Sequence, residues 1–584
     1  MNQRVMVRLL IPFALAIVSA FVYLPTLDFG FVLDDHEQIE LSQAQLTWRH
    51  LPNYFSNDVW GYLQPDTVKG NYYRPIFMTW LMLNYELFGA DPVLWHFSTV
   101  ITHVIATLLV YFIARRLTGD AMIGGISALV FGVHPVHAEG VAWISAVTEP
   151  LFAIFFFGAV LAHLRGREEG QARPTLRWEA SAWMLFTLAI FTKETAIVLP
   201  ALIGAYEWLF PPSPQAATRN RLANAFEVAL PYLGVGLIYV AIRYAVLGSL
   251  TPLARAWPLS TMLATWPFVL SFYLRQLVWP FEYSLFYPIA PVTHPGLKIF
   301  VGPVLIVGVV AIFLFWIGRR SRRAAFASLM LALPLLPVLN LRAFAFDDFL
   351  HDRYLYVPSA GFCIMLAIGL RRGISEHPRI QAAVLIPVAG LLAFQTVMAS
   401  RPWGDNLELY MHTTQVAPES IIANEYLGGE LLAQQRYADA LPLLLKALNR
   451  FPTPGGLELY HLDEQVGQCH LGLGQLDQAA SYIQDAIATD PRVPSGYVSL
   501  AMVELRQGSL AEAEAHIRQA LQLRPRASLP YERFHYYLGA VLEAKGDPRG
   551  ALAEYEAALQ EAPDAEDVLG RVVVLRARLG QPAP

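Results

Sequence analysis

The feature that most constrains this chain is a series of long apolar segments that fill its first 400 residues. Charged residues make up only 15% of the 584 positions, compared with about 25% in ordinary soluble domains. Because the hydrocarbon core of a bilayer is about 30 Å thick, a spanning helix needs about 20 apolar residues. The sequence therefore predicts an all-α, polytopic membrane helical bundle over residues 1–400, with about 11 spanning helices. The candidate spans lie at about 6–26, 93–114, 120–137, 141–164, 179–193, 195–210, 226–247, 297–318, 324–340, 354–370 and 380–400.

Arginines cluster at every second boundary between these segments. Because positive residues concentrate in cytoplasmic loops, these boundaries mark the inner side of the membrane. We therefore predict an integral, multi-pass protein with a cytoplasmic N-terminus and a periplasmic or luminal C-terminal part; in a bacterium the membrane is the cytoplasmic (inner) one. The clusters are Arg4 and Arg8, Arg115 and Arg116, Arg165 to Arg177, Arg219 and Arg221, Arg319 to Arg323, and Arg371 and Arg372.

Lys193 and Glu194 separate two short apolar segments without an intervening loop. A single helix over 178–210 would be about 50 Å long, too long to cross the membrane once. We predict a hairpin that places both charges at the outer face. The first outer loop, 27–92, contains Pro75 to Phe88, which with Leu263 to Pro280 has the Trp- and Tyr-rich composition of helices that lie in the membrane interface.

Residues 401–584 are rich in Ala, Leu, Glu and Gln and carry a repeat of about 34 residues, the period of tetratricopeptide repeats. Prolines close the units at Pro452, Pro491, Pro525 and Pro563. We predict four repeats at about 421–454, 460–493, 494–527 and 532–565, followed by a capping helix that completes an α-solenoid on the outer face. Each unit has a small residue, a turn residue and two alanines: Gly428, Gln435, Ala440 and Ala447; Gly467, Gly474, Ala479 and Ala486; Ala501, Gly508, Ala513 and Ala520; Gly539, Gly546, Ala551 and Ala558.

These features favour some classes of partner over others. Repeat arrays of this kind bind proteins through their concave face, so we predict a protein partner, with a helical spacer as the alternative. A net charge of −5 and the lack of a basic, aromatic-rich stripe argue against nucleic acid. The only two cysteines, Cys363 and Cys469, lie in different parts of the chain and predict neither a disulfide nor a cysteine metal site.

An acidic pair, Asp34-Asp35, follows the first predicted span. A partly desolvated carboxylate beside a like charge has a raised pKa, which suits a general base in catalysis. The alternative is a helix cap or a solvated loop. Either aspartate is a candidate base, and we favour Asp35 because it is expected to point further into the loop.

Other polar groups are predicted to face the same side. Arg74, Lys193 and Arg353 are candidates to bind a lipid phosphate, although such side chains also reach toward headgroups without binding a substrate. Candidate substrate-binding groups nearby are His134, His137, Glu139, Glu149, Glu194, His351, Asp352 and Tyr354. The closely spaced His134, His137 and Glu139 resemble metal ligands, but Pro135 interrupts the backbone and no fourth ligand is implied, so we predict hydrogen bonding.

Several of these motifs together resemble a known family. Asp34-Asp35, Tyr73-Arg74-Pro75, the His-Pro-x-His-x-Glu segment at 134–139, Lys193-Glu194 and Arg353-Tyr-Leu-Tyr356 look like those of the transmembrane and tetratricopeptide repeat-containing proteins. The resemblance covers nearly the whole chain, including motif order. Those proteins are similar to protein O-mannosyltransferases and have the GT-C glycosyltransferase fold.

The resemblance implies an inverting membrane glycosyltransferase that moves a sugar from a polyprenyl-phosphate donor to a hydroxyl. Asp34 or Asp35 would then be the base, with Arg74 and Arg353 near the donor phosphate. The resemblance leaves open whether a divalent cation, Mg²⁺ or Mn²⁺, takes part in the reaction, because paired acidic residues can act alone or bind such an ion. One departure concerns the segment after the histidines, where many relatives have Gly-Arg before an acid: Glu149 keeps the acid, but Val147 replaces the arginine.

Two other functions compete with the enzyme. A membrane-anchored scaffold for envelope protein complexes would use the bundle only to display the repeats, and it would not need charged groups gathered on one face. A transporter of lipid-linked glycans would place ionisable residues near the middle of the bilayer, where the predicted spans offer mainly His103 and tyrosines.

Overall fold

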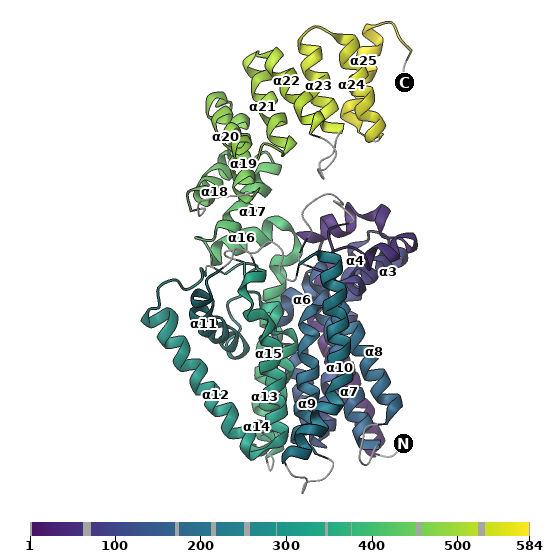
Figure 1. The fold of residues 1–584 in the computed structure, drawn as a ribbon, viewed down its shortest axis with the longest axis vertical. Coiled ribbons are helices and arrows are strands. Elements are labelled where there is room, and N and C mark those ends of the chain that lie inside the picture. The colour runs from purple at the N-terminus through teal and green to yellow at the C-terminus, as the bar shows by residue number, and fades with distance from the viewer. Residues whose placement is uncertain are drawn as a thin grey trace. The chain divides into compact units, whose positions relative to one another are not determined.

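The computed structural model describes residues 3–61, 70, 72–169, 175–211, 218–249, 257–287, 289–344, 348–374, 377–450, 457–523, 532–563 and 565–582. All of the elements in these ranges are helices, which confirms the predicted fold class. The described residues form two compact units (Figure 1), of which the membrane unit extends to Val416 and the repeat unit begins at Ala417.

The membrane unit is a bundle of helices with short connections. Its main helices are α1 (Gln3–Tyr23), α3 (Pro75–Phe88), α4 (Pro92–Thr118), α5 (Ala121–Gly132), α6 (Ala138–Ala142), α7 (Thr148–Glu169), α8 (Leu176–Thr192), α9 (Leu199–Leu209), α10 (Thr218–Leu247), α11 (Leu259–Val278), α12 (Gly302–Arg320), α13 (Arg322–Ala332), α14 (Tyr356–Ile374), α15 (Pro378–Ser400) and α16 (Asn406–Val416). Both segments that we predicted to lie in the interface are helical: Pro75 to Phe88 is α3, and most of Leu263 to Pro280 belongs to α11.

The predicted number of spanning helices is not confirmed. In the described ranges, eight helices are long and apolar enough to cross a membrane, or nine if α5 and the segment Pro135–Ala142, bent by 57°, count as one. Two of the eleven predicted spans correspond to α8 and α9. These helices have 17 and 11 residues and are too short to be counted as full spans. The backbone is extended at Lys193, so these two helices are separated where the hairpin was predicted.

Local sequence signals fix the ends of the helices near the centre of the bundle. The Asp91 carboxylate accepts from the Val93 N–H at the start of α4, and Gly119 ends that helix in the left-handed conformation. The Asp120 carboxylate accepts from the Met122 N–H and begins α5. These are N-caps and a C-cap of ordinary chemistry, in which side chains or glycine satisfy the unpaired ends of a helix.

Small residues let the helices of the membrane unit pack closely. A Cβ atom on Gly361 of α14 would lie only 2.4 Å from the Ala327 carbonyl oxygen of α13, so only glycine fits there. In contrast, α12 exposes most of its apolar side chains, including Leu305, Ile312 and Phe315. Such a surface is expected of a helix that faces lipid, where apolar side chains cost nothing when exposed.

The repeat unit consists of four antiparallel helix pairs and a last single helix. The pairs are α17 (Ile421–Ala433) with α18 (Tyr437–Arg450), α19 (Leu457–Gly472) with α20 (Leu476–Thr489), α21 (Pro494–Gln507) with α22 (Leu510–Gln522), and α23 (Glu532–Ala544) with α24 (Pro548–Glu561), followed by α25 (Glu566–Arg578). Of the unit-closing prolines, Pro452 and Pro525 lie outside the described residues.

The small residues of the repeat pattern sit where the two helices of each pair touch. All eight paired alanines are essentially inaccessible to solvent. A Cβ atom on Gly428 would lie 2.6 Å from Leu444 Cγ, which explains the need for glycine in the first helix. The four turn residues, Gln435, Gly474, Gly508 and Gly546, take positive φ values between the helices, the conformation that ends a helix and reverses the chain.

Candidate active site

Asp35 is fully buried and serves as a hydrogen-bond acceptor. Its Oδ1 accepts from the Ser145 N–H at 2.8 Å and from the Ser145 hydroxyl at 2.5 Å, and its Oδ2 accepts from the Val32 N–H at 3.2 Å. Burial raises the pKa of Asp35 to about 6, while the bonds from Ser145 act in the opposite direction. This carboxylate therefore ties the loop after α1 to the segment between α6 and α7.

Asp34, the next residue toward α1, has different surroundings. It lines a pocket of about 90 Å³ together with Arg74, Lys193, Arg353 and Tyr354. No side chain or N–H group in the described part of the chain donates a hydrogen bond to its carboxylate. Burial, and then the neighbouring charge of Asp35, raise the pKa of Asp34 to about 7, with Arg353 acting in the opposite direction.

Each of the three cations around this pocket is paired with a glutamate. Arg74 donates two bonds to Glu194, from Nε at 3.1 Å and from Nη2 at 2.7 Å. The Lys193 ammonium contacts the Glu149 carboxylate. In these two pairs the partners lie 120 and 44 positions apart in sequence.

The third pair involves the loop before α14. The Arg353 guanidinium contacts Glu139 of α6, and the Arg353 N–H donates to the other Glu139 oxygen at 2.9 Å. The pocket therefore holds three cations that are already charge-balanced, and Asp34 is an additional anion beside them. Arginine uses the same planar group of donors to bind carboxylates and phosphates, so side chains of this type in this arrangement are suited to either anion.

Aromatic rings complete the pocket wall. Trp60, Tyr72, Phe77, Trp143 and Tyr354 all line it. The rings also contact the cations: Arg74 lies 4.3 Å from the centroid of Tyr72, Lys193 lies 4.9 Å from that of Tyr354, and Arg353 lies 5.2 Å from that of Trp143. Cation–π contacts of this kind orient a charged group without consuming all of its hydrogen bonds.

The predicted histidines do not line this pocket. The His134 Nε2–H donates to the Leu277 carbonyl oxygen at 3.1 Å, and His137 Nε2 lies 2.9 Å from the Ser359 hydroxyl oxygen. His351 lies 3.0 Å from Asp348 and 3.4 Å from Glu139. Within the described residues no group of three or more His, Cys, Asp or Glu side chains is arranged to hold a metal ion.

Asp352 also lies outside the pocket, on the other side of the same loop. It accepts from Gln276 at 2.9 Å and from the Tyr287 hydroxyl at 2.7 Å. Because Arg353 is the next residue, these hydrogen bonds to Asp352 hold the backbone that carries the Arg353 side chain in place. Asp352 therefore anchors the loop of Arg353, and His134 and His137 form hydrogen bonds outside the pocket, whereas Glu139, Glu149 and Glu194 pair with its cations.

Several pocket residues were not among the predicted site residues. Ser145 and Trp143 lie in the segment that joins α6 to α7, and Trp60 and Tyr72 lie in the first loop. Each is a common residue with no distinctive spacing, so the sequence offered no signal for them beyond their closeness to Glu139 or Arg74. Val147, where the family resemblance led us to expect arginine, is fully buried in an apolar cluster.

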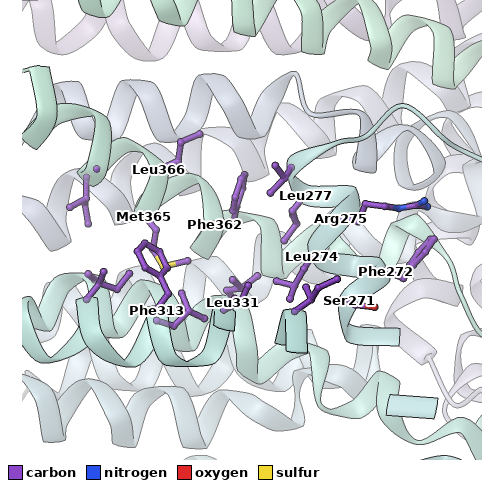
Figure 2. Close-up of a pocket in the computed structure, with 18 of the residues that line it drawn as sticks. Ser271, Phe272, Leu274, Arg275, Leu277, Phe313, Leu331, Phe362, Met365 and Leu366 are labelled. Atoms are coloured by element: carbon purple, nitrogen blue, oxygen red, sulfur yellow. The ribbon is translucent and has the colours of Figure 1, made fainter. Parts of the chain in front are cut away.

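A second, much larger cavity lies between α11, α12, α13 and α14. It has a volume of about 1290 Å³ and is lined mainly by apolar side chains. Figure 2 shows Leu274 and Leu277 of α11, Phe313 of α12, Leu331 of α13 and Phe362 of α14 around it. Tyr287, which bonds Asp352, also lines this cavity, so its wall is continuous with the loop that carries Arg353.

The chain combines a multi-helix membrane unit, which holds a polar pocket, with tetratricopeptide repeats that follow it in sequence. Other proteins with this combination are known. The family model described as "Tetratricopeptide repeat" matches residues 467–528. Over most of its length the chain is similar to proteins named protein O-mannosyl-transferase. TMTC3 of Mus musculus is 24% identical over 93% of this chain and 63% of the relative. F38B6.6 of Caenorhabditis elegans is 26% identical over 72% of this chain and 59% of the relative. Tmtc1 of Drosophila melanogaster is 26% identical over 74% of this chain and 61% of the relative.

These similarities confirm the predicted resemblance to the transmembrane and tetratricopeptide repeat-containing proteins. The chain spans about three fifths of the length of the curated relatives that it matches. Among solved structures, a thermophilic TPR protein of Thermus thermophilus is 23% identical and covers 32% of this chain and 94% of its own, with a TM-score of 0.26.

Proposed function

We propose that this protein is a membrane glycosyltransferase that moves a sugar from a polyprenyl-phosphate donor to a hydroxyl group of a protein, at the outer face of the membrane. The observation that carries the proposal is the pocket in which Asp34 stands, without a hydrogen-bond donor, among Arg74, Lys193 and Arg353. The names of the relatives, protein O-mannosyl-transferases, support the same activity. The repeats favour a protein as the acceptor or its carrier.

In the proposed reaction Asp34 removes the proton from the acceptor hydroxyl. The hydroxyl oxygen forms a bond to the anomeric carbon of the sugar while the bond from that carbon to the donor phosphate breaks, which inverts the configuration. The leaving phosphate keeps the electron pair and is stabilised by Arg74, Lys193 and Arg353. Asp34 is favoured over Asp35 because the Asp35 carboxylate is already occupied by Ser145 and Val32.

The apolar cavity between α11 and α14 is the proposed place for the polyprenyl chain of the donor. Its side chains, among them Leu274, Phe313 and Leu366, offer a hydrocarbon surface. The cavity also meets Tyr287, whose hydroxyl donates to Asp352, the residue before Arg353, so we place the phosphate end of the lipid toward this loop. A lipid-linked phosphate needs this combination of an apolar channel and a cationic end.

Transfer assays on aspartate variants test the proposal. With purified protein, a labelled polyprenyl-phosphate sugar and an acceptor, Asp34→Asn should lower kcat about 10²–10⁴-fold, the usual contribution of a general base, and leave donor binding nearly unchanged. Adding a chelator to the same assay tests whether Mg²⁺ or Mn²⁺ takes part. Asp34→Asn should melt no lower than the wild type at pH 8, because it removes a carboxylate that burial destabilises when charged.

Asp35→Asn is the matched comparison, because it changes the adjacent carboxylate in the same way. It should melt at a lower temperature, since the amide cannot accept every bond from Ser145 and Val32. Full transferase activity in a correctly inserted Asp34→Asn variant would disprove the role of this residue as the base.

A further inference from the structure

The residue before the acidic pair has an unfavourable backbone conformation. Leu33 has φ of 53°, and it is one of only two non-glycine residues with positive φ in the described part of the chain. A leucine side chain is strained there, because its Cβ crowds the backbone. Strained residues of this kind persist only where surrounding contacts hold them, and they gather at functional sites.

The contact that holds Leu33 comes from a distant part of the sequence. The Leu33 N–H donates to the Asn406 side-chain oxygen at 3.0 Å. The Asn406 amide nitrogen lies 3.2 Å from His36 Nε2, and His36 Nδ1 lies 2.6 Å from Glu40. Asn406, the first residue of α16, thus bonds the loop on both sides of Asp34 and Asp35.

The segment just before Asn406 contacts the same region twice more. The Gly30 N–H donates to the Gly404 carbonyl at 3.0 Å. Trp403 stacks on Trp143 with ring centroids 5.7 Å apart, and Trp143 lines the pocket beside Arg353. The chain from Trp403 to Asn406 therefore holds the loop and the wall of the pocket together.

We propose that Asn406 is a positioning residue for the reaction. By holding Leu33 in the left-handed conformation, it directs Asp34 into the pocket while Asp35 turns toward Ser145. The inference rests on the proposed function in that Asp34 is the base. Asn406 does not touch the pocket, so it acts on the rate through the backbone of residues 33 and 34.

The test combines loss and rescue in the full-length protein. Asn406→Ala should lower kcat about 10- to 100-fold, because small misplacements of a reacting group have effects of this size, with the KM for the donor nearly unchanged. Leu33→Gly added to Asn406→Ala should recover most of the lost kcat, since glycine adopts positive φ without strain. Asn406→Asp, which keeps an acceptor oxygen for Leu33, should stay closer to the wild type than Asn406→Ala.

A second readout does not depend on catalysis. Hydrogen–deuterium exchange in peptides that cover 29–36 should be faster in Asn406→Ala than in the wild type or in Gln415→Ala, an exposed position on the same helix. Unchanged exchange and unchanged kcat in Asn406→Ala would overturn the inference, as would the absence of rescue by Leu33→Gly. An active Asp34→Asn variant would instead remove the proposed function, while the exchange result would still report on Asn406.

Discussion

Asp34 and Asp35 are chemically identical neighbours whose roles are separated by their contacts alone. Three donors occupy Asp35, whereas Asp34 faces three cations that have glutamate partners of their own. A buried carboxylate without hydrogen bonds keeps its proton to a higher pH than an exposed one. The difference in contacts is therefore the reason for proposing Asp34, and not Asp35, as the group that takes up the proton.

The pH dependence of transfer follows from this difference. Asp34 acts as a base only when it is ionised, and its pKa is raised from 3.8 to about 7. We expect kcat/KM to rise with pH below about 7 and to level off above it. Because Arg353 lowers the pKa of Asp34, the Arg353→Gln variant should shift the midpoint to a higher pH. Transfer rates of the wild type and of Arg353→Gln, measured between pH 5 and 9, check both the shape of the profile and the shift of its midpoint. A wild-type rate that does not change with pH below 7 would contradict the role of Asp34 as the base.

At the level of helices, the membrane unit separates an apolar cavity from a polar pocket. The cavity lies between α11, α12, α13 and α14, and the polar pocket receives side chains from the loops after α1, α6, α8 and before α14. The bond from Tyr287, which lines the cavity, to Asp352 ties the cavity wall to the residue that precedes Arg353. In the proposed function, the first set of elements holds the lipid part of the donor and the second set carries the reacting groups.

Narrowing the cavity should affect long donors only. Leu366 of α14 lines the cavity and is 42% exposed, so Leu366→Trp places a larger ring inside it. We expect the KM for a long-chain polyprenyl donor to rise about tenfold, roughly the loss of two buried CH₂ groups, and little change for a donor with one or two isoprene units. Leu391→Trp, an exposed position on α15 away from the cavity, serves as the control. Equal effects on short and long donors would place the chain elsewhere.

At the scale of the whole molecule, the chain runs from the membrane unit, which holds the pocket, into the repeat unit. The segment from Trp403 to Asn406 contacts the loop of Asp34, and α16 leads from it to Val416, where the membrane unit ends. The repeat unit has its own buried core, made mainly of alanine, leucine, isoleucine and valine side chains. The molecule therefore consists of a membrane unit with the candidate site and a repeat unit that packs independently.

Protease protection tests the proposed orientation of these units. The arginine clusters place the N-terminus inside, so the repeat unit should face the outside. A protease added to spheroplasts, or to sealed right-side-out vesicles, should remove the repeats from Ala417 onward while the membrane unit remains. Complete protection of the repeats, with digestion only after lysis, would reverse the orientation.

The features that depend on periodicity and composition could be read from the amino-acid sequence. Apolar segments indicated membrane helices, and the spacing of glycine and alanine identified the repeats, because close packing of two helices requires small residues at fixed intervals. It also singled out Arg74, Lys193 and Arg353, which the structure brings to one pocket. It could not give the span count, since helix length near α8 and α9 depends on where the chain bends.

The pairing of charged groups, in contrast, is set by how the helices pack in three dimensions. Arg353 pairs with Glu139, and Asn406 holds Leu33, although 214 and 373 positions separate these partners. Contacts between helices depend on how the whole bundle packs, which no local pattern encodes. The same holds for Asp34 and Asp35, which share a sequence neighbourhood: only the fold gives Asp35 the Ser145 hydrogen bonds and places Asp34 in the cationic pocket, the difference on which our proposal of Asp34 as the base rests.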